Sequence, residues 1–235
     1  MATNEVKLPF AQNPDGRMVH ISEVPNGLAC DCICPKCQTS LVAKKGKKMQ
    51  HHFAHEGRGS CKGAVESALH KAAKQVLAEG HVIHLPEYWC TIQGFGNQKL
   101  FNEIVWEYQK VAQEQQIKEC GEHVVADVVL KDGKRKLIIE IAVTHPIDEE
   151  KAGKIRKMNL SVVEIDLKQH LDTIHNFDDL KKILIDKLHN KTWIHSSKKE
   201  ELILKKRQEL ITELKSHRNL LKTPVIPNKS PKNKK

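Results

Sequence analysis

The clearest periodic pattern in the chain is a helical one that follows Gly63. Alanine, valine and leucine recur at spacings of three and four residues from Ala64 to Leu77, and Gly80 supplies a stop signal. The pattern predicts an amphipathic helix over residues 63–79. The segment is also rich in Ala, the residue with the highest helix propensity.

Two apolar runs with the composition of strands lie on either side of an Asp-Gly turn at 132–133. Residues 123–130 and 136–143 are rich in Val and Ile, and Asp-Gly between two such runs predicts a tight hairpin. Each run carries one acidic residue, Asp127 in the first and Glu140 in the second. An ionised carboxylate in an apolar strand costs free energy unless a cation compensates it.

Shorter elements are predicted on both sides of this hairpin. A strand, a helix and a strand in close succession after residue 135 predict a right-handed crossover onto a parallel neighbour. Together the patterns indicate an α/β protein with a mixed (α+β) sheet. The further elements are a hairpin at the Pro-Asp-Gly turn 14–16, a strand at 81–86, a helix at 148–159, a strand at 161–167, and C-terminal helices at 177–190 and about 197–221, while 87–122 fits either a helix or long strands.

Composition narrows the class of protein. The 235 residues carry a formal net charge of +10, which favours a polyanionic partner because each neutralised phosphate releases counterions. Part of this charge lies in the lysine-rich end of the chain, for which we predict disorder. The chain has no run of about 18 apolar residues, and its first residues lack the apolar stretch of a secretory signal. We therefore expect a soluble, cytoplasmic protein with no membrane partner.

A cluster of cysteines points to a metal. Cys34 and Cys37 form a CxxC pair, a turn that directs two thiolates at one tetrahedral ion. His55 and Cys61 can return as the third and fourth ligands, and this set predicts a structural zinc site with no open position.

Other assignments of the cluster stay open. His52 competes with His55 for the histidine position, and Cys30 or Cys32 can supply a ligand. A redox pair or ordinary buried thiols are the alternatives to zinc.

The acidic residues suggest a second metal. Asp127 and Glu140, on strands joined by a short turn, can point to one place, and oxygen ligands of this kind suit Mg²⁺ or Mn²⁺. Glu66, His70 and Lys74 are spaced four apart and share one face of the predicted helix. The alternative interpretations are edge-facing surface acids for the first pair and a solvated ladder of charges for the helix.

Several segments occur in a recognisable order. They are NGLACDCICPKC, KKGKKMQHHFAH, a single later cysteine, ESALHKAAKQVL, LP, ADVVL and IIEIAVTH. In these segments, over roughly residues 15–168, the chain resembles the competence protein CoiA-like family. The resemblance implies a zinc-binding N-terminal region followed by a restriction-endonuclease-like core of the PD-(D/E)xK superfamily.

The resemblance also implies roles for single residues. Asp127 and Glu140 match the motif aspartate and glutamate, and Glu66 matches the helix glutamate that completes the magnesium site. Ala142 stands where the motif has Lys or Gln, so the expectation is that His70 or Lys74 assists proton transfer instead. Thr144 and His145 follow the glutamate strand and are either part of the same site or caps of the next turn.

Two functions follow as hypotheses. The first is a Mg²⁺-dependent deoxyribonuclease acting on single- or double-stranded DNA, in DNA uptake and recombination or in defence against phage. The second is a DNA-binding or scaffolding module of the same fold with little or no activity. An imperfect leucine stripe in the last helix suits a homo-oligomer or a protein partner, or packing on the parent domain.

The predicted divisions are a hairpin and zinc unit at 1–62, a nuclease core at 63–169, a helical extension at 170–222 and a disordered basic tail at 223–235.

Overall fold

A computed structural model describes residues 7–57, 59 and 61–220 of the chain. The chain divides into two compact units. The larger unit consists of Met1–Tyr88 and Phe101–Ser197, and the smaller unit consists of Trp89–Leu100 and Lys198–Lys235. The predicted class is confirmed, because helices combine with a mixed sheet and a separate cysteine-rich sheet.

The N-terminal part of the larger unit is a five-stranded sheet with the order β2-β1-β3-β4-β5. The predicted hairpin is confirmed, since β1 and β2 pair antiparallel across the Pro-Asp-Gly turn. A short 3-10 helix, Ile21–Glu23, follows the hairpin. The strands are β1 (Phe10–Gln12), β2 (Met18–His20), β3 (Gly27–Ile33), β4 (Ser40–Lys44) and β5 (His52–His55).

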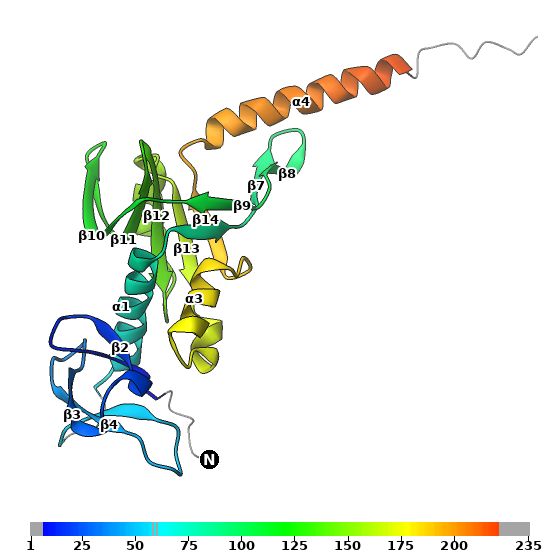
Figure 1. Cartoon of the computed structure of the whole chain (residues 1–235). Helices are drawn as coiled ribbons and strands as arrows, with labels where there is room; N and C mark the ends of the chain where they lie inside the picture. The colour runs from blue at the N-terminus through cyan, green and yellow to red at the C-terminus, as the bar shows by residue number, and fades with distance from the viewer. Residues whose placement is uncertain (1–6, 58, 60, 221–235) are drawn as a thin grey trace, which may run out of the picture. The chain divides into compact units, whose positions relative to one another are not determined.

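Helix α1 (Ala64–Glu79) confirms the strongest sequence prediction and forms the centre of the larger unit. Its buried residues face the core, and it contacts both the N-terminal sheet and the central sheet (Figure 1). The residue that follows the helix, Gly80, must be a glycine for a steric reason. A Cβ at this position would lie 2.7 Å from the hydroxyl oxygen of Tyr108, which donates a hydrogen bond to the carbonyl of Leu77.

The central sheet has five strands in the order β10-β11-β12-β13-β14. The β11–β12 hairpin and the parallel pairing of β12 with β13 through helix α2 (Glu149–Lys157) are confirmed predictions. The α2 helix begins at Asp148, whose side chain accepts a hydrogen bond from the amide of Lys151. The strands are β10 (Lys110–Glu119), β11 (Glu122–Asp132), β12 (Arg135–Ala142), β13 (Val162–Asp166) and β14 (Lys191–His195).

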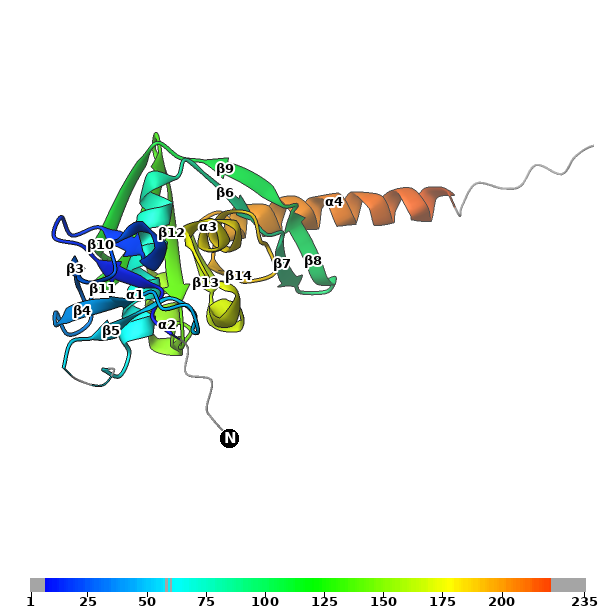
Figure 2. The ribbon, with the colours of Figure 1, turned by 60° about the horizontal axis from the view of Figure 1, so that its bottom comes forward.

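Both faces of this sheet are covered. Val128 and Ile139 on one face pack into the same core as α1 and α3 (Phe177–Ile185), which lie beside each other (Figures 1 and 2). Val129 and Ile138 on the other face pack against Ile155 of α2. Successive residues of each strand therefore point to opposite faces of the sheet and pack against different helices, as expected for a pleated strand.

The structure settles the ambiguous region and corrects one boundary. Residues 87–122 form strands, and one of them, β9 (Ile104–Glu107), pairs with β6 (Val82–Leu85), the strand predicted at 81–86. The helix predicted over 177–190 ends at Ile185, and the chain continues into strand β14. Strand β14 forms because Trp193 packs on Tyr88 and Phe101 and donates its indole N–H to the carbonyl of Pro86.

The smaller unit holds most of a hairpin and the last helix. The hairpin is β7 (Tyr88–Ile92) with β8 (Gly96–Phe101), and Lys99 lies over the ring of Trp89. Helix α4 (Lys199–Leu220) confirms the expected C-terminal helix and exposes Leu204 and Leu214. The predicted tail, 223–235, lies outside the described residues. None of the helices in the described ranges combines the length and the apolar character that a membrane crossing requires.

Candidate functional site

Four predicted zinc ligands meet at the junction between the N-terminal sheet and α1. Cys34 follows β3, Cys37 closes the next turn, His55 ends β5 and Cys61 precedes α1. The turn is fixed by two backbone hydrogen bonds of Cys34, whose amide donates to Thr39 and whose carbonyl accepts from Gln38, both at 2.9 Å. Elements that are separate in the sequence thus direct four ligand atoms to one place.

The geometry of this group fits a tetrahedral ion. The four ligand atoms all lie within 4.8 Å of one another, with 3.7 Å between the sulfurs of Cys34 and Cys61 and 3.3 Å between the Cys37 sulfur and His55 Nε2. Zinc–sulfur bonds of about 2.3 Å at tetrahedral angles place two sulfurs about 3.8 Å apart. The group can therefore bind zinc without rearrangement of the backbone.

The environment of the thiols differs within the group. Hydrogen bonds from the side chain and the backbone of Thr39 lower the pKa of Cys37 to about 6. Burial raises the pKa of Cys61 to about 12. A thiolate at Cys37 is thus the natural first ligand, and a bound cation would favour ionisation of the others.

The competing ligands have other partners. His52 lies with Nδ1 2.9 Å from the carbonyl of Gln50, and Cys30 donates to the carbonyl of Leu41. Cys32 donates to the carbonyl of Cys30, and burial raises the pKa of Cys32 to about 12. Only the set with His55 forms a group of metal-ligating atoms in the described ranges.

Asp127 lies where strands β11 and β12 separate. The antiparallel ladder runs from the turn to the pair Val128–Ile139. One residue further, the Asp127 carboxylate enters the gap and accepts a hydrogen bond of 2.9 Å from the amide of Ile141. The opening between the strands is therefore filled by a carboxylate rather than by a backbone hydrogen bond.

Two side chains of α1 hold this carboxylate. His70 Nε2 lies 2.9 Å from one oxygen of Asp127, and Lys74 Nζ lies 3.1 Å from the other. Lys74 is only 3% exposed and also pairs with Glu114. Burial acts to raise the pKa of Asp127, but His70, the Ile141 amide and Lys74 outweigh it and hold that pKa below its ordinary value.

Glu140 is the buried partner on the neighbouring strand. Its side chain is 5% exposed and forms an ion pair of 2.6 Å with Lys151 of α2. Burial raises the pKa of Glu140 to about 7, and the nearby charge of Asp127 acts in the same direction, while Lys151 opposes them. Asp127 and Glu140, hereafter the acid pair, therefore interact, and their pKa values are displaced in opposite directions.

Glu66 is not part of the same contact set. Its carboxylate accepts a hydrogen bond from the hydroxyl of Thr144, which also contacts His145 at 2.7 Å. In the described ranges, Glu66 and the acid pair do not form a group whose ligand atoms all lie within 4.8 Å of one another. The structure thus brings Asp127, Glu140, His70 and Lys74 together, and it places Glu66 with Thr144 beyond the end of β12.

Two residues of this region were not identified from the sequence. Lys151 reaches Glu140 from the first turn of α2, and Glu164 is the direct register partner of Glu140 on the parallel strand β13. Both line a cleft of about 230 Å³ beside the acid pair, together with Glu140 and His145. Burial raises the pKa of Glu164. The only sequence signal for Glu164 was its position in the predicted parallel strand.

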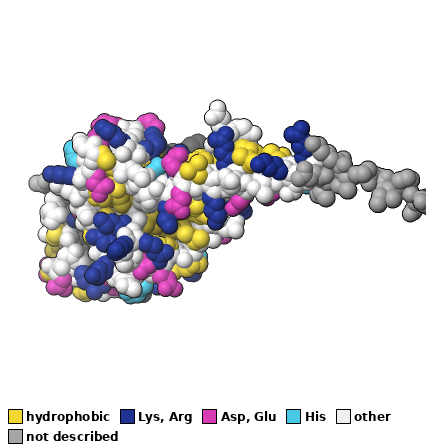
Figure 3. Space-filling view, turned by 90° about the horizontal axis from the view of Figure 1, so that it is seen from above, with side chains coloured by type: hydrophobic (Ala, Val, Ile, Leu, Met, Phe, Trp, Pro, Cys, Tyr) yellow, Lys and Arg dark blue, Asp and Glu magenta, His cyan; other side chains and the backbone are white. Residues whose placement is uncertain are grey.

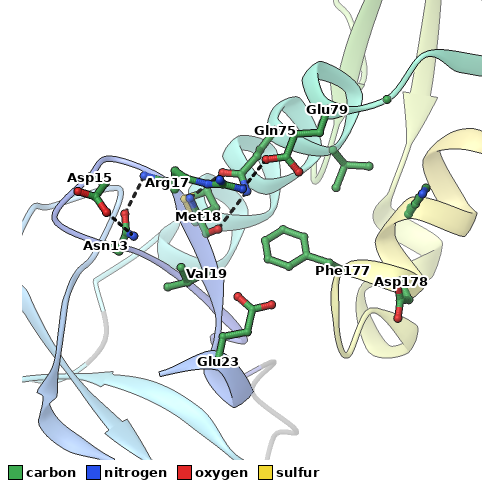
Figure 4. Close-up of a pocket in the computed structure, with 13 residues that line it drawn as sticks. Asn13, Asp15, Arg17, Met18, Val19, Glu23, Gln75, Glu79, Phe177 and Asp178 are labelled. Carbon is green, nitrogen blue, oxygen red and sulfur yellow. Dashed lines mark hydrogen bonds and ion pairs between the residues drawn. The ribbon is translucent and has the colours of Figure 1, made fainter. Parts of the chain in front are cut away.

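A larger cleft, of about 550 Å³, lies between the first hairpin, α1 and α3 (Figure 4). It is lined by side chains of both charges, and Arg17 pairs with Glu79 at 2.7 Å across it. Gln75 bonds the backbone of Met18 at 2.8 Å and 3.1 Å on the same wall. These contacts fasten the hairpin to the helix, and neither member of the acid pair lines this cleft.

Comparison with known proteins adds one finding about the N-terminal region. The family described as "Competence protein CoiA, N-terminal domain" matches residues 28–64. No curated protein and no solved structure was found to match the chain. The matched segment begins in β3, contains all four residues of the zinc group and ends at the first residue of α1. The finding supports the CoiA-like resemblance of the chain.

Proposed function

We propose that the protein is a divalent-metal-dependent deoxyribonuclease of the PD-(D/E)xK type that takes part in the processing of DNA during competence. The observation that supports the proposal most directly is the acid pair, two carboxylates on adjacent strands that interact where the strands separate. Buried carboxylates with pKa values displaced in opposite directions are typical of functional sites. The match to the N-terminal domain of a competence protein supports the biological setting.

The acid pair suits a hard cation. Asp127 and Glu140 offer carboxylate oxygens, and Glu164 lines the adjoining cleft with a third. Mg²⁺ or Mn²⁺ bound there would supply the activated water and the charge neutralisation that phosphodiester hydrolysis needs. The basic net charge of the chain suits DNA as the substrate.

The cations around the acid pair have roles in this proposal. Ala142 occupies the position of the usual motif lysine, and Lys151 brings an ammonium group to within 2.6 Å of Glu140 from a different element. His70 and Lys74 fix the orientation of the Asp127 carboxylate from α1. Lys151 is thus a candidate to stabilise developing negative charge, and the two α1 residues are positioning residues.

One observation favours the alternative of a DNA-binding module without activity. Both acids already have cationic partners, and no lysine or glutamine follows Glu140 at the motif position. Ion pairs of this kind can hold a fold together without catalysis.

The experiment compares cleavage with binding. Plasmid and single-stranded DNA are incubated with the zinc-loaded protein and added Mg²⁺ or Mn²⁺, and binding is measured in parallel without added divalent metal. We expect metal-dependent cleavage that falls at least 100-fold in D127N and E140Q while binding persists. E150Q is the matched control, since Glu150 is an exposed acid of α2 that pairs only with Lys154 in the described ranges. Binding without cleavage at any metal concentration would establish the alternative, and neither binding nor cleavage would refute both.

A further inference from the structure

Three lysines lie directly opposite one another across the central sheet. Lys110 of β10 is the register partner of Lys131 of β11, and Lys131 is the register partner of Lys136 of β12. We call Lys110, Lys131 and Lys136 the lysine row. Residues that are directly opposite in antiparallel strands have Cα atoms about 4.5–5.5 Å apart, so the row spans about 10 Å.

The lysine row has no counter-charge in the described ranges. Lys110 and Lys136 are exposed and Lys131 is half-buried, and none of the three side chains has an ion-pair or hydrogen-bond partner there. The hairpin's arginine does not contribute to the row, because Arg135 pairs with Asp132 and lies over the ring of Trp106 on the other face. Like charges placed directly opposite one another in a sheet are destabilising.

The row shares a face with Glu140. Alternate residues of a strand point to one face, so Lys136, Ile138 and Glu140 lie on the same side of β12, and Ile138 packs against α2. The row next to the lysines is apolar, because Ala112 and Ile138 are the register partners of Val129. The aliphatic parts of the lysine side chains can therefore cover the apolar row of Ala112, Val129 and Ile138 while their ammonium groups stay in solvent. Neither of these two rows contains an acidic residue.

The distance from the row to the acid pair is set by the strands. Asp127 and Lys131 are four residues apart on β11, and Lys136 and Glu140 are four apart on β12. At about 3.3 Å per residue the row lies about 13 Å from the acid pair. This separation runs along the strands, whereas the row runs across them.

We infer that the lysine row is an anchor for the phosphate backbone of DNA, placed about 13 Å along the strands from the acid pair. The inference rests on the proposed function, because it takes the acid pair as the point of cleavage. Uncompensated like charge on a sheet is stabilised when a polyanion lies over it, and a line of ammonium groups suits successive phosphates better than a single small anion. Figure 3 shows Lys and Arg side chains gathered on one face of the larger unit, in keeping with the basic net charge of the chain.

The test removes the charge of the row and leaves the proposed chemistry intact. One variant replaces each lysine of the row by glutamine (K110Q, K131Q and K136Q). A matched control makes the same change of charge at three exposed lysines that lie outside the central sheet (K168Q, K181Q and K182Q). Binding to a duplex of about 30 base pairs is measured by fluorescence anisotropy between about 50 and 200 mM KCl, without added divalent metal.

The salt dependence separates a specific anchor from a general effect of charge. Each lost phosphate contact reduces the magnitude of the slope of log K against log salt by about 0.9. The row variant lacks three such contacts, so the magnitude of its slope should fall by about 2.7 and its affinity for DNA by at least 10-fold. The control should lose less than a third of that slope. Zinc content and thermal unfolding identify any misfolded variant, and we expect the row variant to be at least as stable as the wild type.

The outcomes distinguish this inference from the proposed function. If the wild type binds DNA and the row variant keeps the wild-type slope, or the control loses as much, the anchor is refuted and the proposed function stands. If the wild type binds no DNA, both fail. If the row variant is folded and its K110Q, K131Q and K136Q single variants each lose about 0.9 of the slope, the anchor is established.

Discussion

Replacing Glu140 by glutamine should raise the free energy of unfolding of the protein in the absence of added Mg²⁺, and this increase should become larger as the pH rises. The Glu140 side chain is 5% exposed, and burial raises its pKa from the ordinary 4.5 to about 7. A carboxyl group whose folded-state pKa is raised contributes stability that is complete below about pH 4.5 and is lost as pH rises through about 7. Above pH 7 the folded protein therefore bears the full cost of ionising a buried group.

The size of the effect follows from the displacement of the pKa. The difference between about 7 and 4.5 amounts to about 3 kcal/mol at 1.36 kcal/mol per unit. Because the unfolded chain ionises Glu140 at a lower pH than the folded protein does, the loss of stability grows with pH. It is about 1 kcal/mol at pH 5.5 and about 3 kcal/mol at pH 8.5. Glutamine has the same shape and no charge, and Lys151, whose side chain is 29% exposed, can turn to solvent. We expect E140Q to gain about 2 kcal/mol relative to the wild type between these two pH values.

Urea unfolding of the zinc-loaded protein measures this directly. The wild type, E140Q and E150Q are unfolded at about pH 5.5, 7 and 8.5 without added Mg²⁺, and the difference from the wild type is taken at each pH. E150Q should differ from the wild type by less than about 1 kcal/mol at every pH, since Glu150 is 78% exposed. A constant difference between E140Q and the wild type, or destabilisation of E140Q at pH 8.5, would contradict the argument.

Two further predictions concern the zinc group and Asp127. C34S should reduce bound zinc from one ion per chain to nearly none and lower the Tm by about 10 °C. C90S should keep the metal, because Cys90 lies outside the group of four ligands. Metal analysis measures the zinc content and calorimetry measures the Tm. D127N should cost about 3 kcal/mol at pH 7, because it leaves the buried Lys74 without one of its charges, while D132N, which affects a surface pair, should cost less than about 1 kcal/mol. Because the folded-state pKa of Asp127 is lowered, its contribution is present above about pH 3.8 and is lost as pH falls further, and equal stability of D127N and wild type at pH 7 would refute this account.

The sequence was most informative where structure is decided locally. Helix α1 has an uninterrupted apolar stripe and a glycine stop, and the β11–β12 hairpin has an Asp-Gly turn between apolar runs, so both could be predicted. Strand β10 could not be, because it is the polar edge of the sheet and most of its residues are exposed. An edge strand takes its conformation from its neighbour rather than from its own pattern.

The zinc group could be predicted because its spacing carries the chemistry. The CxxC turn selects Cys34 and Cys37 without reference to the rest of the fold, and the structure was needed for the choice of the histidine and of the remaining cysteine. That choice depends on pairing in the sheet, since His55 is the register partner of Leu41 and thereby reaches the turn. His52, at the other end of the same strand, pairs with Lys44 and cannot.

The acid pair could be predicted in part. The Asp-Gly turn puts Asp127 and Glu140 at equal distances from the hairpin end, so their approach follows from the sequence. Lys151 and Glu164 depend on the crossover, which sets α2 and β13 against β12 in a register that no local pattern encodes. The contact of Glu66 with Thr144 instead of the acid pair likewise depends on where α1 crosses the sheet.

The two carboxylates differ in how freely they can change partners. Asp127 is held by His70, by the amide of Ile141 and by Lys74, which is 3% exposed. The one ion-pair partner of Glu140 among the described side chains is Lys151, which reaches it from the first turn of a surface helix. Asp127 is therefore the fixed side of the acid pair, and in the proposed metal site Glu140 would be the side at which a cation replaces a lysine. A site arranged in this way keeps its geometry when it is empty, because the core lysine and the backbone amide preserve one carboxylate while the other exchanges its partner.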